Sequence, residues 1–325
     1  MPDKNKTQGH SKPIRLLAEQ AIAELLPMED ANAPRRIPTG FADLDKLTGG
    51  WRRGDLVVVA ARPGMGLTSL VLSMVRSTAM ERKRPVAIFS LEASGRQLAS
   101  RMISMGSGIS FAKLRNGALS EADNTLVREH AERISKAPIF IDDRVALVLS
   151  ELCAEARRLK SDHDVDLLVI DHLQLIADDM SGRGIDRARS AGGISRRLKQ
   201  LARELDVPVI VMSQVSRTVE TRGGDRRPQL TVLRDAGDAE QNADVVCFLY
   251  RPEYYRVTED EHGSTRGIGE LIVSKNRNGP LGAARLRFIP ETVRFKDLES
   301  DRMASAHGAS RSDRSVGPGL DHIPF

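Results

Sequence analysis

Aromatic residues are scarce in this chain of 325 residues, which contains one tryptophan, three tyrosines and eight phenylalanines. A protein that held single-stranded nucleic acid mainly by stacking bases on aromatic rings would carry more of them. Any contact with nucleic acid is therefore predicted to go through charged side chains and backbone groups.

Cysteine is also rare, since Cys153 and Cys247 are the only two, each in an apolar run without a cysteine or histidine at ligand spacing. We expect buried thiols, and neither a disulfide nor a zinc site.

Long apolar runs are missing too. None approaches the roughly 20 residues that span a bilayer, and no secretory stretch follows the polar N-terminus. The sequence thus predicts a soluble cytoplasmic protein without a membrane partner.

The charge balance is mildly basic, with a net charge of +5 and a pI of about 9.3. A small excess of positive charge suits a protein that touches phosphates. It suits a basic protein with no such partner equally well, so charge alone does not decide between the two.

Short β-rich runs alternate with stretches long enough for helices, and the first six of these runs are Leu56–Ala61, Val86–Ser90, Ile139–Ile141, Leu167–Ile170, Val207–Met212 and Val245–Tyr250. Apolar strands that alternate with helices indicate an α/β fold, with a mostly parallel twisted sheet and helices on both faces. The later runs predict an antiparallel C-terminal extension, and they are Glu270–Ser274, Ala284–Ile289 and Thr292–Lys296.

The patterns divide the chain into three parts. Residues 1–36 are predicted to hold a disordered start and an amphipathic helix at Ile14–Met28, which packs either on its own domain or on a neighbouring surface. Residues 37–298 form the α/β domain. Residues 299–325 are mostly rich in Ser, Gly, Ala and Arg, which predicts a disordered tail.

A phosphate-binding loop is predicted directly after the first strand and before a helix that begins at about Thr68. Its glycines, Gly64 and Gly66, allow the tight path in which backbone N–H groups surround phosphates, and Thr68 would offer its hydroxyl to Mg²⁺. The alternative is a glycine-rich turn without a ligand. The nucleotide-binding residues predicted here are Ala61, Arg62, Pro63, Gly64, Met65, Gly66, Leu67, Thr68 and Ser69.

Leu67 departs from the pattern, because a phosphate loop has lysine at this position to reach the β- and γ-phosphates. Leucine has neither charge nor donor. The loss of a charge-assisted hydrogen bond costs about 1.5–3 kcal/mol in binding, and a comparable loss in the transition state costs about 10²–10³ in rate. Binding through the backbone is expected to survive, whereas fast hydrolysis is not.

Three further polar residues stand at or just after the ends of predicted strands, where side chains face a nucleotide in such folds. Asp171 ends the apolar run LLVID and would hold Mg²⁺. Glu92 follows the strand VAIFS and is placed to polarise an attacking water. Gln214, in the segment SQVSR, closes a third strand and would report the γ-phosphate.

Over residues 37–296 the order of motifs resembles the RecA-like P-loop NTPase motor of DnaB-type replicative helicases. The motifs are IPTGFADLDKLTGGWRRGDL, AARPGMGLTS, IFSLEAS, IFIDD, LLVIDHLQL, ISRRLKQLARELDVPVIVMSQVSR, RRPQLTVLRDAGDAEQNADVVCFLYR and KNRNGPLG. The resemblance implies a hexameric ring that hydrolyses ATP with Mg²⁺ and moves 5′→3′ on single-stranded DNA, in a bacterial, plasmid or phage replication setting. The helix at 14–28 matches the family's linker helix, which docks on the adjacent subunit.

The resemblance also assigns roles. Glu92 matches the catalytic glutamate, Asp171 the magnesium aspartate and Gln214 the sensor glutamine. Lys275 and Arg277 match a basic pair that reaches the neighbouring subunit's nucleotide, with Arg277 as the arginine finger; by composition alone, KNRNG is a solvated basic turn.

A DNA-gripping channel loop is implied at 234–240, with Arg234, Asp235 and Gly237 as contacts. The family usually has glutamate in place of Asp235 and an apolar residue in place of Asp238, so the extra carboxylate should weaken DNA binding slightly.

Two other features depart from the family pattern. Only some 35 residues precede the motor, so the helical domain that recruits primase is expected to be absent. The last residues, Asp321–Phe325, resemble the acidic tip of bacterial single-stranded DNA-binding proteins and would dock on replication partners. The alternative for this tip is chance similarity.

Three functions are compatible with these motifs. The first is an ATP-dependent helicase. The second is an impaired pseudo-helicase that binds nucleotide or single-stranded DNA as an accessory replication factor, which Leu67 favours. The third is a RecA-type recombinase, which the segments KNRNG and SQVSR argue against.

Overall fold

A computed structural model of the protein describes residues 13–16, 18, 36–177, 187–215, 227–236 and 239–298, with the backbone alone at 187–191 and 234–236. The chain divides into two units, Met1–Arg36 and Ile37–Phe325. In the first unit, residues 14–16 and 18 are helical. The rest of the helix predicted at 14–28 lies outside the described residues, as do the tail from residue 299 and the Asp321–Phe325 tip.

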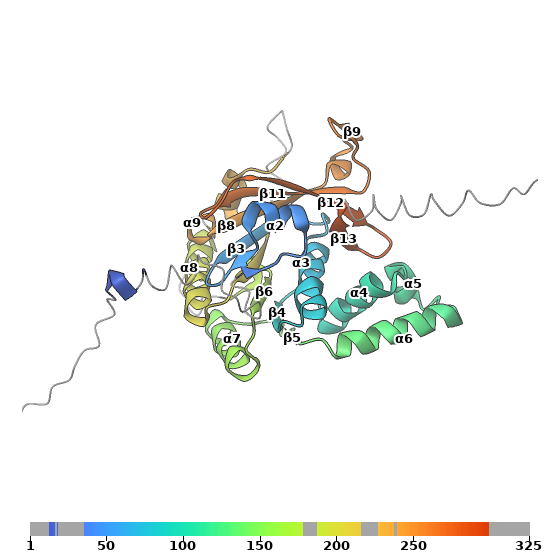
Figure 1. Ribbon diagram of the computed structural model, residues 1–325, viewed down its shortest axis with the longest axis horizontal. Coiled ribbons are helices and arrows are strands. Elements are labelled where there is room, and N and C mark those ends of the chain that lie inside the picture. Colours follow the sequence, from blue (N-terminus) through green and yellow to red (C-terminus); the bar gives the residue numbers. More distant parts are fainter. Residues whose placement is uncertain are drawn as a thin grey trace, which may run out of the picture. The chain divides into compact units, whose positions relative to one another are not determined.

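The second unit is built on a sheet with nine strands among the described residues, in the order β13–β12–β11–β8–β3–β7–β6–β4–β5 (Figure 1). Six neighbouring strands run parallel, and these are β8 (Val245–Tyr250), β3 (Leu56–Ala61), β7 (Val209–Gln214), β6 (Leu167–Asp171), β4 (Val86–Ser90) and β5 (Ile139–Asp142). Three antiparallel strands complete one edge, namely β11 (Ile268–Asn276), β12 (Gly282–Ile289) and β13 (Arg294–Asp297). The predicted fold class is confirmed.

Two predicted strands begin two residues later than expected. The run from Val207 enters the sheet as β7 only at Val209, because Pro208 has no N–H to donate. The last strand begins at Arg294, since Val293, with a φ of 48°, belongs to a turn. Four very short strands form two small pairs that the sequence did not predict, and these are β1 (Arg36–Ile37) with β2 (Trp51–Arg52) and β9 (Glu259–Asp260) with β10 (Gly263–Ser264).

Side chains of the sheet alternate between two buried cores. On β3, Val57 and Val59 face one core, while Leu56 and Val58 face the other. The first core is closed by α2 (Ala42–Thr48), α3 (Leu67–Arg76) and α4 (Gly95–Ser107), and the second by α7 (Leu149–His163), α8 (Arg187–Leu205) and α9 (Ala239–Asn242). Helices α5 (Phe111–Asn116) and α6 (Glu121–Ser135) pack on α4 and form an arm at one side (Figure 1).

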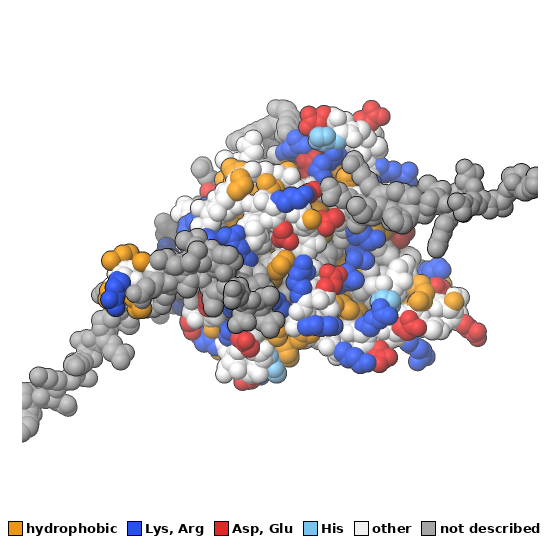
Figure 2. All heavy atoms as spheres, viewed as in Figure 1, with side chains coloured by type: hydrophobic (Ala, Val, Ile, Leu, Met, Phe, Trp, Pro, Cys, Tyr) orange, Lys and Arg blue, Asp and Glu red, His pale blue; other side chains and the backbone are white. Residues whose placement is uncertain are grey.

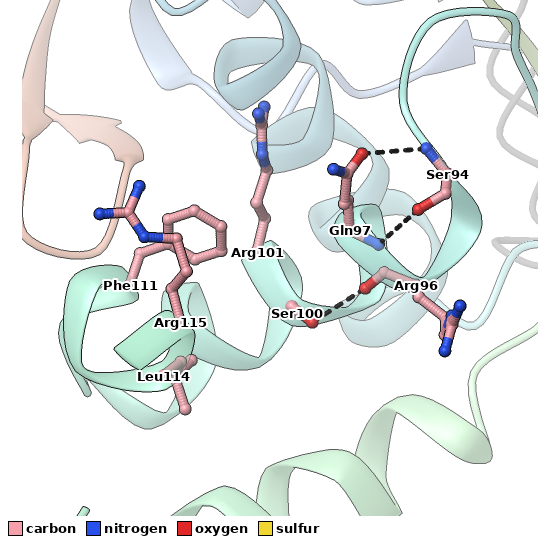
Figure 3. A pocket seen from close by; sticks show the side chains of 8 residues that line it. All are labelled: Ser94, Arg96, Gln97, Ser100, Arg101, Phe111, Leu114 and Arg115. Atoms are coloured by element: carbon pink, nitrogen blue, oxygen red, sulfur yellow. Dashed lines mark hydrogen bonds between the residues drawn. The ribbon is translucent and has the colours of Figure 1, made fainter. Parts of the chain in front are cut away.

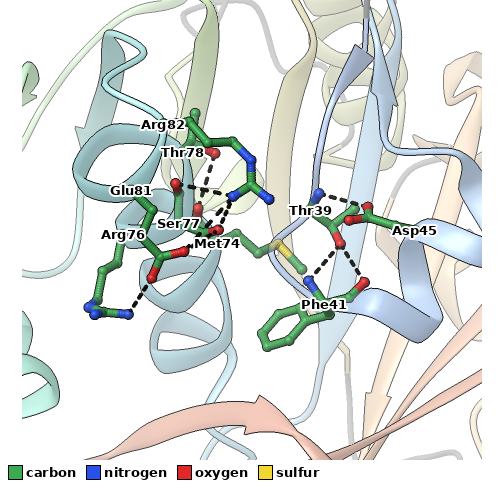
Figure 4. A network of polar contacts seen from close by, with 9 residues as sticks. All are labelled: Thr39, Phe41, Asp45, Met74, Arg76, Ser77, Thr78, Glu81 and Arg82. Atoms are coloured by element: carbon green, nitrogen blue, oxygen red, sulfur yellow. Dashed lines mark hydrogen bonds and ion pairs between the residues drawn. The ribbon is translucent and has the colours of Figure 1, made fainter. Parts of the chain in front are cut away.

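The far end of α3 is tied down by a polar network (Figure 4). Helix α3 continues into the π-helical turn η1 (Ser77–Glu81), where Glu81 pairs with Arg76 at 2.8 Å and Arg82 donates to the Ser77 hydroxyl. Gly40 lies against this turn, because a Cβ atom there would come within 2.6 Å of the Ser77 Cβ. The opposite end of α3 adjoins the predicted phosphate loop, so this network fixes the helix that presents the loop.

A charged cluster lies at the amino ends of β3 and β8. Asp244 accepts from the backbone N–H of Leu56 at 2.9 Å and pairs with Lys199 at 2.5 Å, and the Lys199 Nζ lies 3.7 Å from Asp55. Burial, reinforced by the charge of Asp244, raises the pKa of Asp55 from 3.8 to about 6 despite the opposing effect of Lys199.

Asp55→Asn is expected to gain stability relative to the wild type as the pH rises from about 4 to about 8. Between pH 3.8 and about 6 the folded wild type keeps the Asp55 proton that the unfolded chain has lost, so its stability falls with rising pH, by about 3 kcal/mol in all. Asparagine carries no such proton. Urea unfolding across this pH range measures the shift, with Asp43→Asn, a change at an exposed carboxylate, as control. A difference between Asp55→Asn and wild type that does not vary with pH would contradict the expectation.

Both cysteines are buried free thiols, as predicted, and burial raises the pKa of Cys247 to about 12. Among the described residues no helix is both long and apolar enough to cross a membrane. Figure 2 shows Lys and Arg side chains interspersed with Asp and Glu over the described part of the face in view. On this face the excess of positive charge is therefore not gathered into one patch.

Candidate nucleotide-binding site

A pocket of about 350 Å³ lies at the carboxyl ends of the parallel strands, where the loops after β3, β4, β6 and β7 meet. It is lined by most of the predicted nucleotide-binding loop together with side chains from other elements, namely Ala61, Arg62, Pro63, Gly64, Gly66, Leu67, Thr68, Ser69, Glu92, Arg101, Phe111, Asp171, His172, Met212, Gln214, Phe288 and Val293. The structure thus brings Glu92, Asp171 and Gln214 together with the loop, although they are far apart in the sequence.

The loop between β3 and α3 follows a path that needs glycine. Gly64 and Gly66 have φ values of 84° and 91°, in the left-handed region that side chains disfavour. A Cβ atom at Gly66 would also lie 3.3 Å from Phe295. Helix α3 begins at Leu67, one residue before the predicted start, and the Leu70 N–H donates to the Gly66 carbonyl at 2.9 Å. The N-terminus of this ten-residue helix therefore points its free N–H groups at the pocket.

Leu67 is buried, and its side chain both joins the core and lines the pocket. Two arginines stand on the pocket wall. The Arg62 guanidinium lies 5.9 Å and 5.7 Å from the ring centres of Tyr254 and Tyr255. Arg101, on α4, was not singled out from the sequence. The pocket therefore holds positive charge, but not at the position where a lysine would stand.

Asp171 and Thr68 meet beneath the loop. The Thr68 hydroxyl donates to Asp171 Oδ2 at 3.3 Å, and the Asp171 side chain is only 6% exposed. A buried carboxylate beside a hydroxyl provides the oxygen ligands that Mg²⁺ prefers. The two residues predicted to hold the ion are thus adjacent.

Glu92 is positioned by the turn between β4 and α4. The Ser90 hydroxyl donates to the Ala93 carbonyl at 2.6 Å, and Ser94 begins α4 with a capping box that it shares with Gln97 (Figure 3). Gln214 Nε2 donates to Glu92 Oε2 at 3.3 Å, which joins the predicted sensor to the predicted catalytic carboxylate. Gln174, which the sequence did not single out, donates to the Ser213 hydroxyl at 2.9 Å and to the Gln214 carbonyl at 3.0 Å.

His172 is the main site residue that sequence reasoning missed. Its Nδ1 lies 3.2 Å from Glu92 Oε2 and 3.7 Å from Asp171 Oδ1. The signal was present in the motif LLVIDHLQL, in which this histidine directly follows the aspartate.

Comparisons with known proteins place this geometry in a family. The family described as DnaB-like helicase C terminal domain matches residues 36–297. The chain belongs to this family. It is 44% identical over 264 residues to the replicative DNA helicase DnaB of Geobacillus stearothermophilus and 43% identical over 264 residues to the replicative DNA helicase DnaC of Bacillus subtilis (strain 168). Each match covers 81% of this chain and 57% of the relative, so the chain spans little more than half the length of these helicases.

Two solved structures have the same fold. The ATPase domain of G40P aligns with a TM-score of 0.79 at 33% identity, covering 89% of this chain and 99% of that one. A DnaB-like replicative helicase, described with its interactions with primase, aligns with a TM-score of 0.76 at 32% identity, covering 89% and 67%. The predicted RecA-like fold is confirmed for this DnaB-like chain.

The predicted basic pair of the DnaB-like domain does not reach its own pocket. Lys275 and Arg277 lie at or just after the end of β11, whose Asn276 pairs with Val245, the first residue of β8. This is the amino end of the parallel strands, whereas the pocket lies at the carboxyl end. The Arg277 Nη2 donates to the Gln241 carbonyl at 2.9 Å, and its Nη1 lies 3.5 Å from Asp244 Oδ1. Burial, together with the charge of Arg277, lowers the pKa of Lys275, which donates to the Glu240 carbonyl at 2.5 Å.

The predicted DNA-contacting segment of the DnaB-like domain is partly described. Arg234 and Asp235 lie in the 3₁₀ helix η4 (Leu230–Ala236), and Gly237 lies outside the described residues. Helix α9 follows at Ala239 and packs on η4. Its carbonyls at Glu240 and Gln241 are those that accept from Lys275 and Arg277, so the predicted DNA segment adjoins the predicted basic pair.

A larger hollow of about 610 Å³ opens between α4 and α5, beside the nucleotide pocket of the DnaB-like domain. Three of the side chains that line it are arginines. Figure 3 shows the full lining, which is Ser94, Arg96, Gln97, Ser100, Arg101, Phe111, Leu114 and Arg115. Arg101 and Phe111 line both spaces. The pocket wall on this side is therefore positively charged, which favours an anionic ligand.

Proposed function

We propose that this chain is the ATP-driven motor of a DnaB-like helicase, which assembles into a hexameric ring in the cytoplasm and moves 5′→3′ on single-stranded DNA. One observation supports the proposal above all others. The groups that would act on a nucleotide are divided between opposite ends of the sheet, with Glu92, Asp171 and Gln214 at one end and Arg277 at the other. A site divided in this way is complete only when a second subunit brings its Arg277 to the first subunit's pocket.

The residues present fit a magnesium-bound nucleoside triphosphate, apart from position 67. The backbone conformation at Gly64 and Gly66 favours glycine. Because glycine has no side chain, the backbone N–H groups of the loop stay open to phosphates. Thr68 and Asp171 would hold Mg²⁺, which, when bound, offsets the negative charge of the phosphates. Glu92 would accept a proton from the attacking water, and Gln214, hydrogen-bonded to Glu92, would sense the γ-phosphate.

Arg277 of the neighbouring subunit would stabilise the charge that develops on the transferred phosphate, and Lys275 would support it. Arg234 and the backbone of the following segment would grip DNA phosphates without reading sequence. Because α9 connects this segment to the basic pair, a shift of the DNA-contacting segment would be passed to the neighbour's nucleotide.

Leu67 favours a second candidate, a pseudo-helicase that binds nucleotide and single-stranded DNA but turns over slowly. The two candidates are separated by measuring ATP affinity, ATP turnover with and without single-stranded DNA, and strand displacement on substrates with a 5′ or a 3′ tail. A helicase displaces strands from 5′-tailed substrates and hydrolyses ATP faster with DNA. A pseudo-helicase binds both ligands with little turnover. A chain that binds neither nucleotide nor DNA would refute both candidates.

A further inference from the structure

Three side chains of metal-binding type converge at the base of the pocket. One ligand atom each from Glu92, Asp171 and His172 lies within 4.8 Å of the other two. The side chains of Asp171 and His172 are 6% and 9% exposed, while that of Glu92 is 57% exposed and borders the open side. The cluster is therefore closed from below and accessible from the pocket.

The His172 Nδ1 is buried and makes no hydrogen bond, although Glu92 Oε2 is only 3.2 Å away. A buried polar atom without a partner costs free energy and calls for an explanation. This nitrogen faces the carboxylates of Glu92 and Asp171. A cation between them would satisfy all three.

The spacing suits such a cation. Bonds of about 2.1 Å place neighbouring ligands of a metal about 3 Å apart and opposite ligands about 4 Å apart. The two separations from His172 Nδ1, 3.2 Å and 3.7 Å, lie in this range, and all three ligand atoms lie within 4.8 Å of one another. An imidazole nitrogen with two carboxylates is also a poor match to Mg²⁺, which prefers oxygen alone, and a better match to first-row transition ions.

We propose that Glu92, Asp171 and His172 form a mixed nitrogen–oxygen site that binds a divalent transition ion, with Mn²⁺ preferred over Mg²⁺. The site belongs to the chain without nucleotide, whereas with nucleotide bound Glu92 would be the base and Asp171 a magnesium ligand, so the proposal goes beyond the motor function.

The test uses the full chain without nucleotide. Mn²⁺ is titrated while the free ion is followed by electron paramagnetic resonance, and pulsed measurements on the bound ion detect coupling to a ligand nitrogen. We expect one site with nitrogen coupling that binds Mn²⁺ at least about tenfold more tightly than Mg²⁺. His172→Ala should lower Mn²⁺ affinity at least about tenfold and change Mg²⁺ affinity less than about twofold.

His172→Gln keeps an oxygen donor and should retain some bound Mn²⁺ without the nitrogen coupling. His262→Ala, a change in an exposed turn, is the matched control and should behave as wild type. Bound Mn²⁺ without nitrogen coupling in the wild type, unchanged affinity in His172→Ala, or no binding at all would overturn the proposal. Those results would leave the motor function standing. Failure to bind ATP or DNA would refute the motor function without affecting the Mn²⁺ result.

Discussion

Leu67→Lys is expected to raise the DNA-stimulated rate of ATP hydrolysis by about 10²–10³ and to strengthen ATP binding by about 1.5–3 kcal/mol. Leu67 lines the pocket at the first residue of α3, so a lysine stem can follow the apolar wall and place its ammonium among the phosphates. The other groups proposed for the chemistry are already in place. Steady-state turnover with saturating single-stranded DNA measures the change.

Leu67→Met is the matched control, because it keeps an apolar side chain of similar size without a charge. We expect its turnover to stay within a few-fold of the Leu67 protein, and a thermal melt of each variant checks that the core around Leu67 persists. If the Leu67 protein already hydrolyses ATP at the rate of the lysine variant, the missing charge does not limit this site.

Arg277→Ala is expected to lower turnover by about 10³ or more, the effect of an arginine finger in phosphoryl transfer. The change is made in the Leu67→Lys background, where the loss is large enough to measure. Because Arg277 lies at the opposite end of the sheet from its own pocket, its loss should disable the neighbour's site. A subunit carrying Glu92→Gln has the complementary defect, because its own pocket is inactive while its Arg277 can still serve the neighbour's pocket.

Mixing these two inactive variants tests that geometry. In a ring that mixes them equally at random, about one quarter of interfaces combine an intact Glu92 pocket with an intact Arg277, so activity should return to about that fraction. Arg266→Ala, a change at an exposed arginine, should leave turnover unaltered. If turnover does not recover in the mixture, the divided site is wrong.

The sequence predicted the sheet well, because its strands are continuous apolar runs whose burial follows from composition alone. It also predicted that Glu92, Asp171 and Gln214 would meet, since the carboxyl ends of parallel strands share one edge. The predicted strand boundaries were wrong where a single residue set them, as at Pro208, which delays the start of β7 to Val209. His172 and Arg101 were missed because their importance depends on packing between distant segments, which no local pattern encodes.

The DNA-contacting residues stay predictions, and so do the catalytic roles. Arg234 and Asp235 are described by their backbone alone, and Gly237 lies outside the described residues. The basic pair is a different case. Composition favoured a solvated turn at KNRNG, and residues 277–280 are exposed, but the side chains of Lys275 and Arg277 also donate to carbonyls of α9.

Strand β3 connects the end of the sheet that holds the nucleotide pocket with the end that holds Lys275 and Arg277. Asp55, a member of the charged cluster whose Asp244 pairs with Arg277, immediately precedes the first residue of β3. The phosphate loop follows the last residue of β3, and over six residues the strand spans about 20 Å. It is buried between parallel neighbours on both sides and does not bend easily. In the proposed ring we therefore expect each subunit to turn as a rigid body, so that the motion driven by ATP takes place at the interfaces between subunits. Cross-linking one such interface should stop the whole proposed ring.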